Sequence, residues 1–302
     1  MTKKTTLISF VLFLMCMVLG CANIDCIRPR IVMDKIGITK ERTYFAGNKK
    51  YPFESRYDEK DKASGYFKSN NKNISILIGK EKPYSYFIKC IDSMGNDMWS
   101  RSLETIVPGM RGKRIAIYEG TSESLVFLLT EGLGPSPIYK IVIFTEDGNV
   151  KIVEKLQGAG GGIFGEYILD INVFSINNEP YIIATGDEGV AIYNLKGERI
   201  TFLNTKAVTS EVTCIEFKKR NNKYVAIYVA HRSITGSSTL FILNDKFKLM
   251  YKEILPNNGV SRTMWIGVEH LEYDDDLIVA AGEIYECTEV GNSMVWKYSF
   301  SK

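Results

Sequence analysis

The chain has 302 residues, 38 of them Lys or Arg and 35 Asp or Glu, with a formal net charge of +3. Without the first twenty residues it loses Lys3 and Lys4 but no acid, which leaves about +1. A nearly neutral body excludes a nucleic-acid binder that works by neutralising phosphates. The length fits one large β domain or two smaller ones, and the 17 Tyr and 15 Phe favour strands.

The first twenty residues have the build of a secretory signal peptide. Lys3 and Lys4 precede an apolar run from Leu7 to Leu19, which closes in Val-Leu-Gly-Cys at Cys21. The run is too short to span a bilayer comfortably, and no later run approaches the ~20 apolar residues that a span needs. We therefore expect a helical signal peptide at residues 1–20.

The residues Val18-Leu19-Gly20-Cys21 resemble the lipobox of bacterial lipoproteins. In that family the cysteine thiol receives a diacylglycerol and becomes the new N-terminus. The resemblance therefore implies a lipoprotein with palmitate-type chains on Cys21, a tether at residues 21–30 and a folded domain at 31–302. Two or more acyl chains hold a protein on a membrane, because each buried methylene contributes about 0.8 kcal/mol. The alternative is an ordinary cleaved signal or a short anchor.

The residue after the lipidated cysteine influences sorting in Gram-negative lipoproteins. Here it is Ala22 and not the Asp that is associated with inner-membrane retention. We expect the cell envelope as the location, and the outer membrane if the host is Gram-negative.

A unit of four short strand-like runs separated by polar turns recurs along the chain. It is clearest between Ile168 and Leu203. Such a unit cannot bury both faces alone, so it must stack on copies of itself. The predicted strands lie at residues 74–78, 86–91, 98–103, 114–118, 125–129, 139–144, 149–153, 168–174, 181–186, 190–193, 199–203, 212–217, 224–230, 239–243, 248–254, 264–271, 277–281 and 294–300.

Equivalent turns recur about every 50 residues, which is close to the repeat lengths of WD40 and kelch propellers. These turns lie near Gly95, Gly148, Gly197, Asp245 and Gly291. The predicted fold is all-β, a β-propeller of about five four-stranded blades. The number of blades becomes six if residues 40 to 72 contain further strands. A β-sandwich with coincidental spacing is the alternative.

The segment Asp92-x-x-Gly95-x-x-x-Trp99 resembles the blade motif of quinoprotein-like and WD40-like β-propellers, and Gly291 to Trp296 is a weaker match. The resemblance covers roughly residues 40 to 300, but no blade ends in Trp-Asp and most lack the Trp. The residues that hold quinone and calcium in quinoprotein enzymes cannot be placed here. The resemblance therefore implies the fold and not the cofactor.

The last repeat contains only three strand-like runs. Residues 31–38 are expected to supply the fourth from the other end of the chain, which would close the ring and remove exposed sheet edges. Residues 40 to 72 are expected to form a long insertion in the first blade.

Few residues suggest catalysis or metal binding. The two histidines, His231 and His270, have no partner at the spacing of a zinc site. Gly160 to Gly165 spells GxGxxG but leads into a strand rather than a helix. Asp274-Asp275-Asp276 fits a solvated turn better than a calcium site. We expect no metal, no cofactor and no enzymatic activity.

The cysteines after Cys21 show no CxxC spacing. Cys90 and Cys214 lie in strand-like runs and are expected to be small buried apolar residues. Whether Cys26, Cys90, Cys214 and Cys287 form disulfides stays open, because an exported protein can oxidise them.

The candidate partner-binding residues lie on loops. His231 and Arg232 follow a strand, and Arg262 and Trp265 precede another. Arg and Trp are enriched where proteins dock, although single residues of this kind often serve packing. We expect a lipid-anchored, non-catalytic scaffold that binds another envelope protein. The alternative is an envelope enzyme or a receptor for a small ligand or carbohydrate, which would use the central channel.

Replacing Cys21 by Ala tests the lipid anchor. The variant should leave the membrane fraction while staying folded, because the acyl chains have lost their attachment site. Cell fractionation measures this outcome, and persistent membrane retention of the variant contradicts the lipid anchor.

Overall fold

The structure is a computed structural model, and it describes residues 38–45, 62–69, 71–82, 85–134, 137–157, 167–187, 189–205, 207–219, 222–231, 237–255, 265–271, 276–285 and 289–300. The chain divides into two compact units, Met1–Met33 and Asp34–Lys302, and every described residue belongs to the second. The expected signal peptide (1–20), Cys21 and the tether (21–30) therefore lie outside the described residues. Within that described part, no helix has the length and apolar character needed to cross a membrane.

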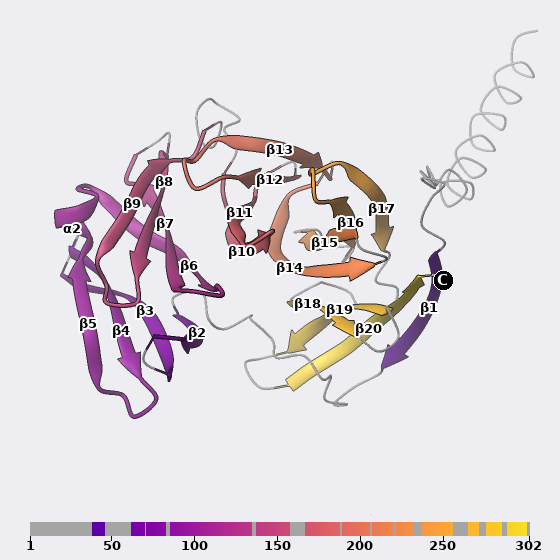
Figure 1. Ribbon diagram of the computed structural model, residues 1–302, viewed down its shortest axis with the longest axis horizontal. Coiled ribbons are helices and arrows are strands. Elements are labelled where there is room, and N and C mark those ends of the chain that lie inside the picture. Colours follow the sequence, from indigo (N-terminus) through magenta and orange to yellow (C-terminus); the bar gives the residue numbers. More distant parts are fainter. Residues whose placement is uncertain are drawn as a thin grey trace, which may run out of the picture. The chain divides into compact units, whose positions relative to one another are not determined.

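The described strands form five four-stranded antiparallel sheets, so the fold is all-β (Figure 1). Four sheets each consist of strands that are consecutive in the chain. The first is β2 (Lys62–Phe67), β3 (Lys72–Lys82), β4 (Ser85–Asp92) and β5 (Asp97–Ser102); the second β6 (Met110–Glu119), β7 (Ser124–Gly132), β8 (Tyr139–Thr145) and β9 (Val150–Lys155); the third β10 (Asp170–Ile176), β11 (Glu179–Thr185), β12 (Gly189–Tyr193) and β13 (Arg199–Asn204); the fourth β14 (Thr209–Lys219), β15 (Asn222–His231), β16 (Ser238–Asn244) and β17 (Leu249–Leu255).

The fifth sheet combines both ends of the unit. Its strands are β18 (Trp265–Leu271), β19 (Asp276–Tyr285), β20 (Glu289–Phe300) and β1 (Ile38–Phe45), in the order β1-β20-β19-β18. The helix α2 (Leu103–Ile106) is the single helical turn within the described residues. Five separate sheets do not match the two facing sheets of a β-sandwich, so that alternative is wrong.

The strand that joins the two ends of the unit was expected at residues 31–38 but lies at β1. It pairs antiparallel with β20, from Ile38 opposite Phe300 to Phe45 opposite Ser293. An outer strand has a neighbour on one side only, so it needs less apolar sequence than an inner strand. Of the expected strand, only Ile38 lies within β1, and residues 31–37 lie outside the described part.

Two further expectations are corrected. Residues 40 to 72 are not simply an insertion, because β1 and β2 both lie there and β2 supplies the first strand of its sheet. Gly291 does not occupy a turn, because β20 runs through it from Glu289 to Phe300. The other predicted strands all occur, with ends shifted by a few residues.

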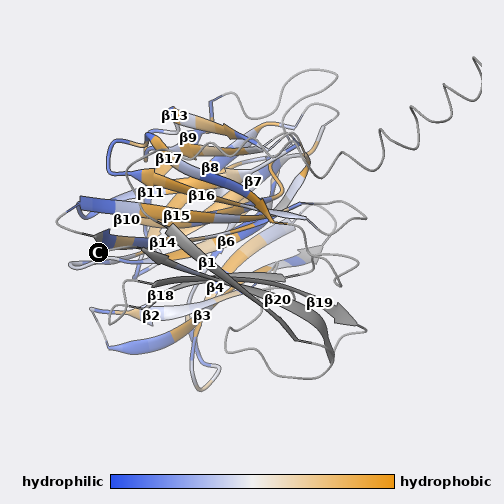
Figure 2. Cartoon of the chain, turned by 90° about the vertical axis from the view of Figure 1, so that its right-hand side faces the viewer, coloured by the Kyte–Doolittle hydropathy of each residue, from blue (hydrophilic) through white to orange (hydrophobic). Residues whose placement is uncertain are grey.

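Among the described residues the core forms four hydrophobic clusters, and each cluster joins two sheets that are consecutive in the chain. Strand β7 shows how this arises. Val126 and Leu128 pack towards the first sheet, whereas Phe127 and Leu129 pack towards the third. Successive side chains of a strand point to opposite faces, so a strand that is buried on both faces must be apolar throughout. Figure 2 shows the same pattern on β15 and β16, where hydrophobic residues predominate.

The turn between the third and fourth strands has one geometry in four sheets. In each, the fourth residue donates its N–H to the carbonyl of the first and has a positive φ. These donors are Gly95 (φ 86°), Gly148 (φ 73°), Gly197 (φ 71°) and Phe247 (φ 58°), and their acceptors are Asp92, Thr145, Asn194 and Asn244. The predicted turns near Gly95, Gly148, Gly197 and Asp245 are therefore confirmed.

Trp99 fixes the first sheet to the second. Its ring stacks on Phe144 with 5.8 Å between centroids, and its indole N–H donates to the carbonyl of Glu146 at 2.9 Å. Arg101 adds a hydrogen bond from Nε to the carbonyl of Gly148 at 2.8 Å. A Cβ on Gly148 would lie 2.5 Å from Cδ2 of Trp99, so only glycine fits between the indole and this turn.

We predict that Gly148→Ala destabilises the protein more than Gly95→Ala. Both glycines have positive φ, which costs alanine about 1 kcal/mol, but a Cβ on Gly95 meets no atom within 4 Å. The clash with Trp99 should cost Gly148→Ala a further ~1–3 kcal/mol. Denaturant unfolding of both variants measures the difference, and equal losses would contradict the fixed position of Trp99.

Candidate functional site

The three longest connections between strands lead from β1 to β2, from β9 to β10 and from β17 to β18, each from the last strand of one sheet to the first strand of the next. In a sheet of four antiparallel strands, the second-to-third connection and the link to the next sheet lie at the same end. We call this the long-loop end. By strand order it contains His231, which ends β15, and Trp265, which begins β18. Arg232 and Arg262 lie outside the described residues, and of Trp265 only the backbone is described.

His231 is buried rather than exposed at this end. It is 4% exposed, and its ring nitrogens both have partners within the same hairpin. Nδ1 lies 2.9 Å from Ser237 Oγ, and Nε2 lies 2.8 Å from Thr239 Oγ1. Burial, with Lys252 nearby, lowers the pKa of the imidazole to about 4. His231 therefore has both ring nitrogens occupied and is neutral at pH 7.

The second sheet carries a polar group that the sequence did not reveal. We call it the Glu131 cluster: Arg111, Lys113, Glu131 and Tyr139. Arg111 and Tyr139 are the register neighbours of Glu131 on β6 and β8. Glu131 Oε2 accepts from Arg111 Nη2 at 2.7 Å and Nε at 3.0 Å. Glu131 Oε1 accepts from Lys113 Nζ at 2.6 Å and the Tyr139 hydroxyl at 2.9 Å.

Glu131 is therefore a saturated carboxylate. Burial alone would raise its pKa, but the hydrogen bonds from Lys113 and Arg111 outweigh burial and hold the pKa below 4.5. Burial and the bond to Glu131 raise the pKa of Tyr139, so its phenol stays protonated and is a poor nucleophile. The cluster is built to hold side chains in place rather than to transfer protons.

Exposed apolar side chains lie next to this cluster. Leu133 is 45% exposed, Ile138 48% and Tyr167 44%. Leu133 and Ile138 belong to the β7–β8 loop, which is closed by a hydrogen bond from the Gly132 N–H to the Ile138 carbonyl at 2.9 Å. Tyr167 precedes Ile168, which is buried in the same hydrophobic cluster as Tyr139. We call Arg111, Leu133, Ile138 and Tyr167 the Arg111 surface.

No metal-binding group of three or more His, Cys, Asp or Glu occurs within the described residues. Cys90 is buried in β4, and burial raises the pKa of its thiol to about 12. Cys214 is half-buried in β14, and neither cysteine forms a disulfide with another described residue. The expectation of a small buried residue in a strand is therefore confirmed for Cys90. Outside the described part lie Cys26, Cys287, Gly160 to Gly165 and Asp274-Asp275.

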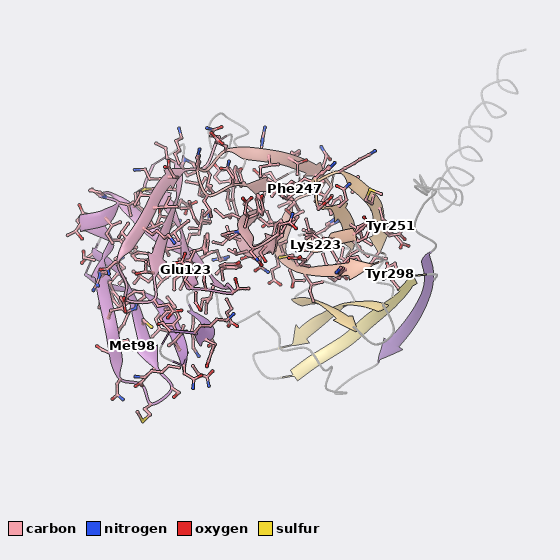
Figure 3. The ribbon with its side chains drawn as sticks, in the orientation of Figure 1. Met98, Glu123, Lys223, Phe247, Tyr251 and Tyr298 are labelled. Atoms are coloured by element: carbon pink, nitrogen blue, oxygen red, sulfur yellow. The ribbon has the colours of Figure 1, made fainter. Side chains whose placement is uncertain are left out.

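Tyr298 joins the fifth sheet to the fourth (Figure 3). It is fully buried, and its hydroxyl donates to Glu253 Oε2 at 3.0 Å. The Tyr251 hydroxyl donates to the same oxygen at 2.6 Å, and the two rings meet edge to face at 6.1 Å. Burial and Glu253 raise the Tyr298 pKa well above 10.0, so this group serves packing rather than chemistry.

No protein-family model and no curated protein matches this sequence. Similar solved structures include a member of the duf4221 family from Bacteroides vulgatus, with a TM-score of 0.47, 10% identity and coverage of 89% of this chain and 100% of that chain. A protein of unknown function from Bacteroides caccae has a TM-score of 0.43 at 9% identity and covers 82% and 85% of the two chains. A neuraminidase-like protein of isolate A/little yellow-shouldered bat/Guatemala has a TM-score of 0.42 at 11% identity and covers 75% and 76%. These scores are all below 0.5, and we draw no family, activity or ligand from them.

We predict that His231 titrates near pH 4 in the folded protein. Because its pKa lies below the usual 6.5, protonation favours the unfolded chain, and stability is lost as the pH falls from 6.5 through about 4. The chain has two histidines, so an NMR titration gives few imidazole signals. The imidazole signal that is missing from the spectrum of His231→Gln belongs to His231. If that signal titrates with a pKa near 6.5, the burial of His231 is contradicted.

Proposed function

We propose that this chain is a lipid-anchored β-propeller of the cell envelope that acts as a non-catalytic scaffold for another envelope protein. Cys21 would carry the lipid and hold the folded part at the membrane, the outer membrane if the host is Gram-negative. The five sheets would be its blades. Neither nucleic acid nor a cofactor takes part in this proposal.

The contacts between the sheets support a propeller. The first strands of successive sheets touch in chain order: β2 contacts β6, β6 contacts β10, β10 contacts β14 and β14 contacts β18. First strands that meet in sequence are typical of blades around a common axis. The pairing of β1 with β20 supports closure by the chain ends, because it covers an edge that would otherwise be free.

The Arg111 surface is the observation that carries the binding role. Three large apolar side chains are 44–48% exposed beside an arginine that is held by Glu131. Aromatic and arginine side chains surrounded by apolar neighbours dominate the affinity of protein interfaces. A rigid sheet end also loses little conformational entropy on binding, which favours recognition of a partner without a conformational change.

The alternative is a small-ligand receptor or enzyme that uses the channel between the first strands. Asp170 on β10 is a polar residue of these first strands that would suit it. However, Asp170 Oδ1 lies 3.6 Å from Arg114 Nε, and its Oδ2 accepts the Val212 N–H at 3.1 Å. These contacts link β6, β10 and β14, so they favour a role in holding three sheets together over a role in ligand binding.

Photo-crosslinking in living cells tests the proposal. A photoreactive residue at Ile138 should trap an envelope protein, identified by mass spectrometry. One at Met94, which is 81% exposed in the β4–β5 turn at the opposite end of its sheet, should not. Leu133→Asp should abolish the product and change the free energy of unfolding by less than about 0.5 kcal/mol, because Leu133 is on the surface. Equal products from Ile138 and Met94, or none from Ile138, would exclude this surface as the docking site.

A further inference from the structure

The Glu131 cluster leaves one side of the Arg111 guanidinium unpaired. A guanidinium has five N–H groups. Arg111 uses Nε and one N–H of Nη2, both directed at Glu131 Oε2. The two N–H groups of Nη1 and the second of Nη2 have no partner within the described residues, and the side chain is 51% exposed.

Charge within the cluster is unbalanced. Two cations, Arg111 and Lys113, share the single carboxylate of Glu131. Lys113 is 16% exposed and is held by Glu131 Oε1, with its ammonium 5.0 Å from the centre of the Tyr139 ring. The excess positive charge is therefore available to a ligand at Arg111 and not at Lys113.

We propose that Arg111 receives a carboxylate of the partner protein, an Asp or Glu side chain flanked by apolar residues. This inference rests on the proposed function and adds the chemistry of the partner. The free N–H groups of Nη1 and Nη2 form a planar fork that fits the two oxygens of a carboxylate. Glu131 holds the guanidinium in one orientation before binding, so little side-chain entropy is lost when the partner docks.

The neighbouring side chains define what flanks that carboxylate. Leu133 lies beside the first strand of the sheet, because its N–H donates to the Gly109 carbonyl at 3.4 Å. Leu133 and Ile138 are both about half exposed, so they offer apolar contact on the loop next to Arg111. An anionic membrane attracts several basic residues at once. The cluster offers one unpaired guanidinium, which favours a single carboxylate over a lipid surface.

Crosslinking from Ile138 in Arg111 variants tests this chemistry. Arg111→Gln removes both the charge and the fork, and should lower the yield of the crosslinked product about ten-fold. Arg111→Lys keeps the charge but not the fork, so it should give an intermediate yield. Lys151→Gln is the matched control, because Lys151 pairs with Glu123 on the surface at the opposite end of the sheet and the charge change is the same. This control should leave the yield unchanged.

The trapped partner segment provides the second measurement. This segment should contain an Asp or Glu, and changing that residue to Asn or Gln should lower the crosslink yield as much as Arg111→Gln does. Combining the partner change with Arg111→Gln should lower the yield no further. Unfolding curves of each variant show whether a loss of yield comes from a loss of folded protein. If Arg111→Gln unfolds, Arg111→Lys still tests the inference, because its lysine can pair with Glu131.

The outcomes separate the two proposals. A product from Ile138 that is insensitive to Arg111→Gln overturns the carboxylate and leaves the scaffold role standing. No product from Ile138 overturns both. A crosslink to lipid instead of protein, or binding of the purified protein to phosphatidylglycerol vesicles that is lost in Arg111→Gln, assigns Arg111 to the membrane and overturns the inference.

Discussion

The structure depends on the burial of both faces of each four-stranded sheet against its neighbours. The middle strands are apolar on both sides, so a single sheet would leave both faces of β7 or β15 in water. The side chains of Val126 and Phe127 belong to different clusters although they are adjacent in the chain. Each sheet is therefore stable only when it packs between neighbouring sheets, and specific polar contacts set the distance between adjacent sheets. Trp99 and Gly148 show how close that spacing is, because the indole leaves no room for a Cβ.

Burial on both faces also explains where polar residues occur. A buried carboxylate is tolerated only where cations or donors meet it, and such partners are available at strand ends. Glu131 follows the apolar run of β7 and meets Arg111 and Lys113, which begin the neighbouring strand. His231 occupies the corresponding end of β15 and meets two hydroxyls instead. The ends of the second strands β7 and β15 are thus places where apolar packing gives way to buried polar contacts.

The sequence allowed the strands and their repeat to be predicted, because alternation and turn residues are local signals. It did not allow the exact partner strand β1 to be found, since Lys40, Glu41 and Arg42 give an outer strand little apolar character. It also missed the Glu131 cluster. Arg111, Lys113 and Tyr139 lie 20, 18 and 8 residues from Glu131 in the chain and become its neighbours through strand pairing. An acidic residue directly after an apolar run, with basic residues opening the preceding strand, is the signal that could have found it. Burial of His231 was equally hidden, because Ser237 and Thr239 reach it only after the hairpin forms.

The pairing of β1 with β20 has a consequence for how the molecule is made. Ile38 lies opposite Phe300, so the strand that is synthesised first must wait for a partner synthesised about 250 residues later. Until then β1 presents an unsatisfied edge, which favours aggregation. Loss of even a short stretch at the carboxyl terminus would therefore release the amino-terminal strand as well.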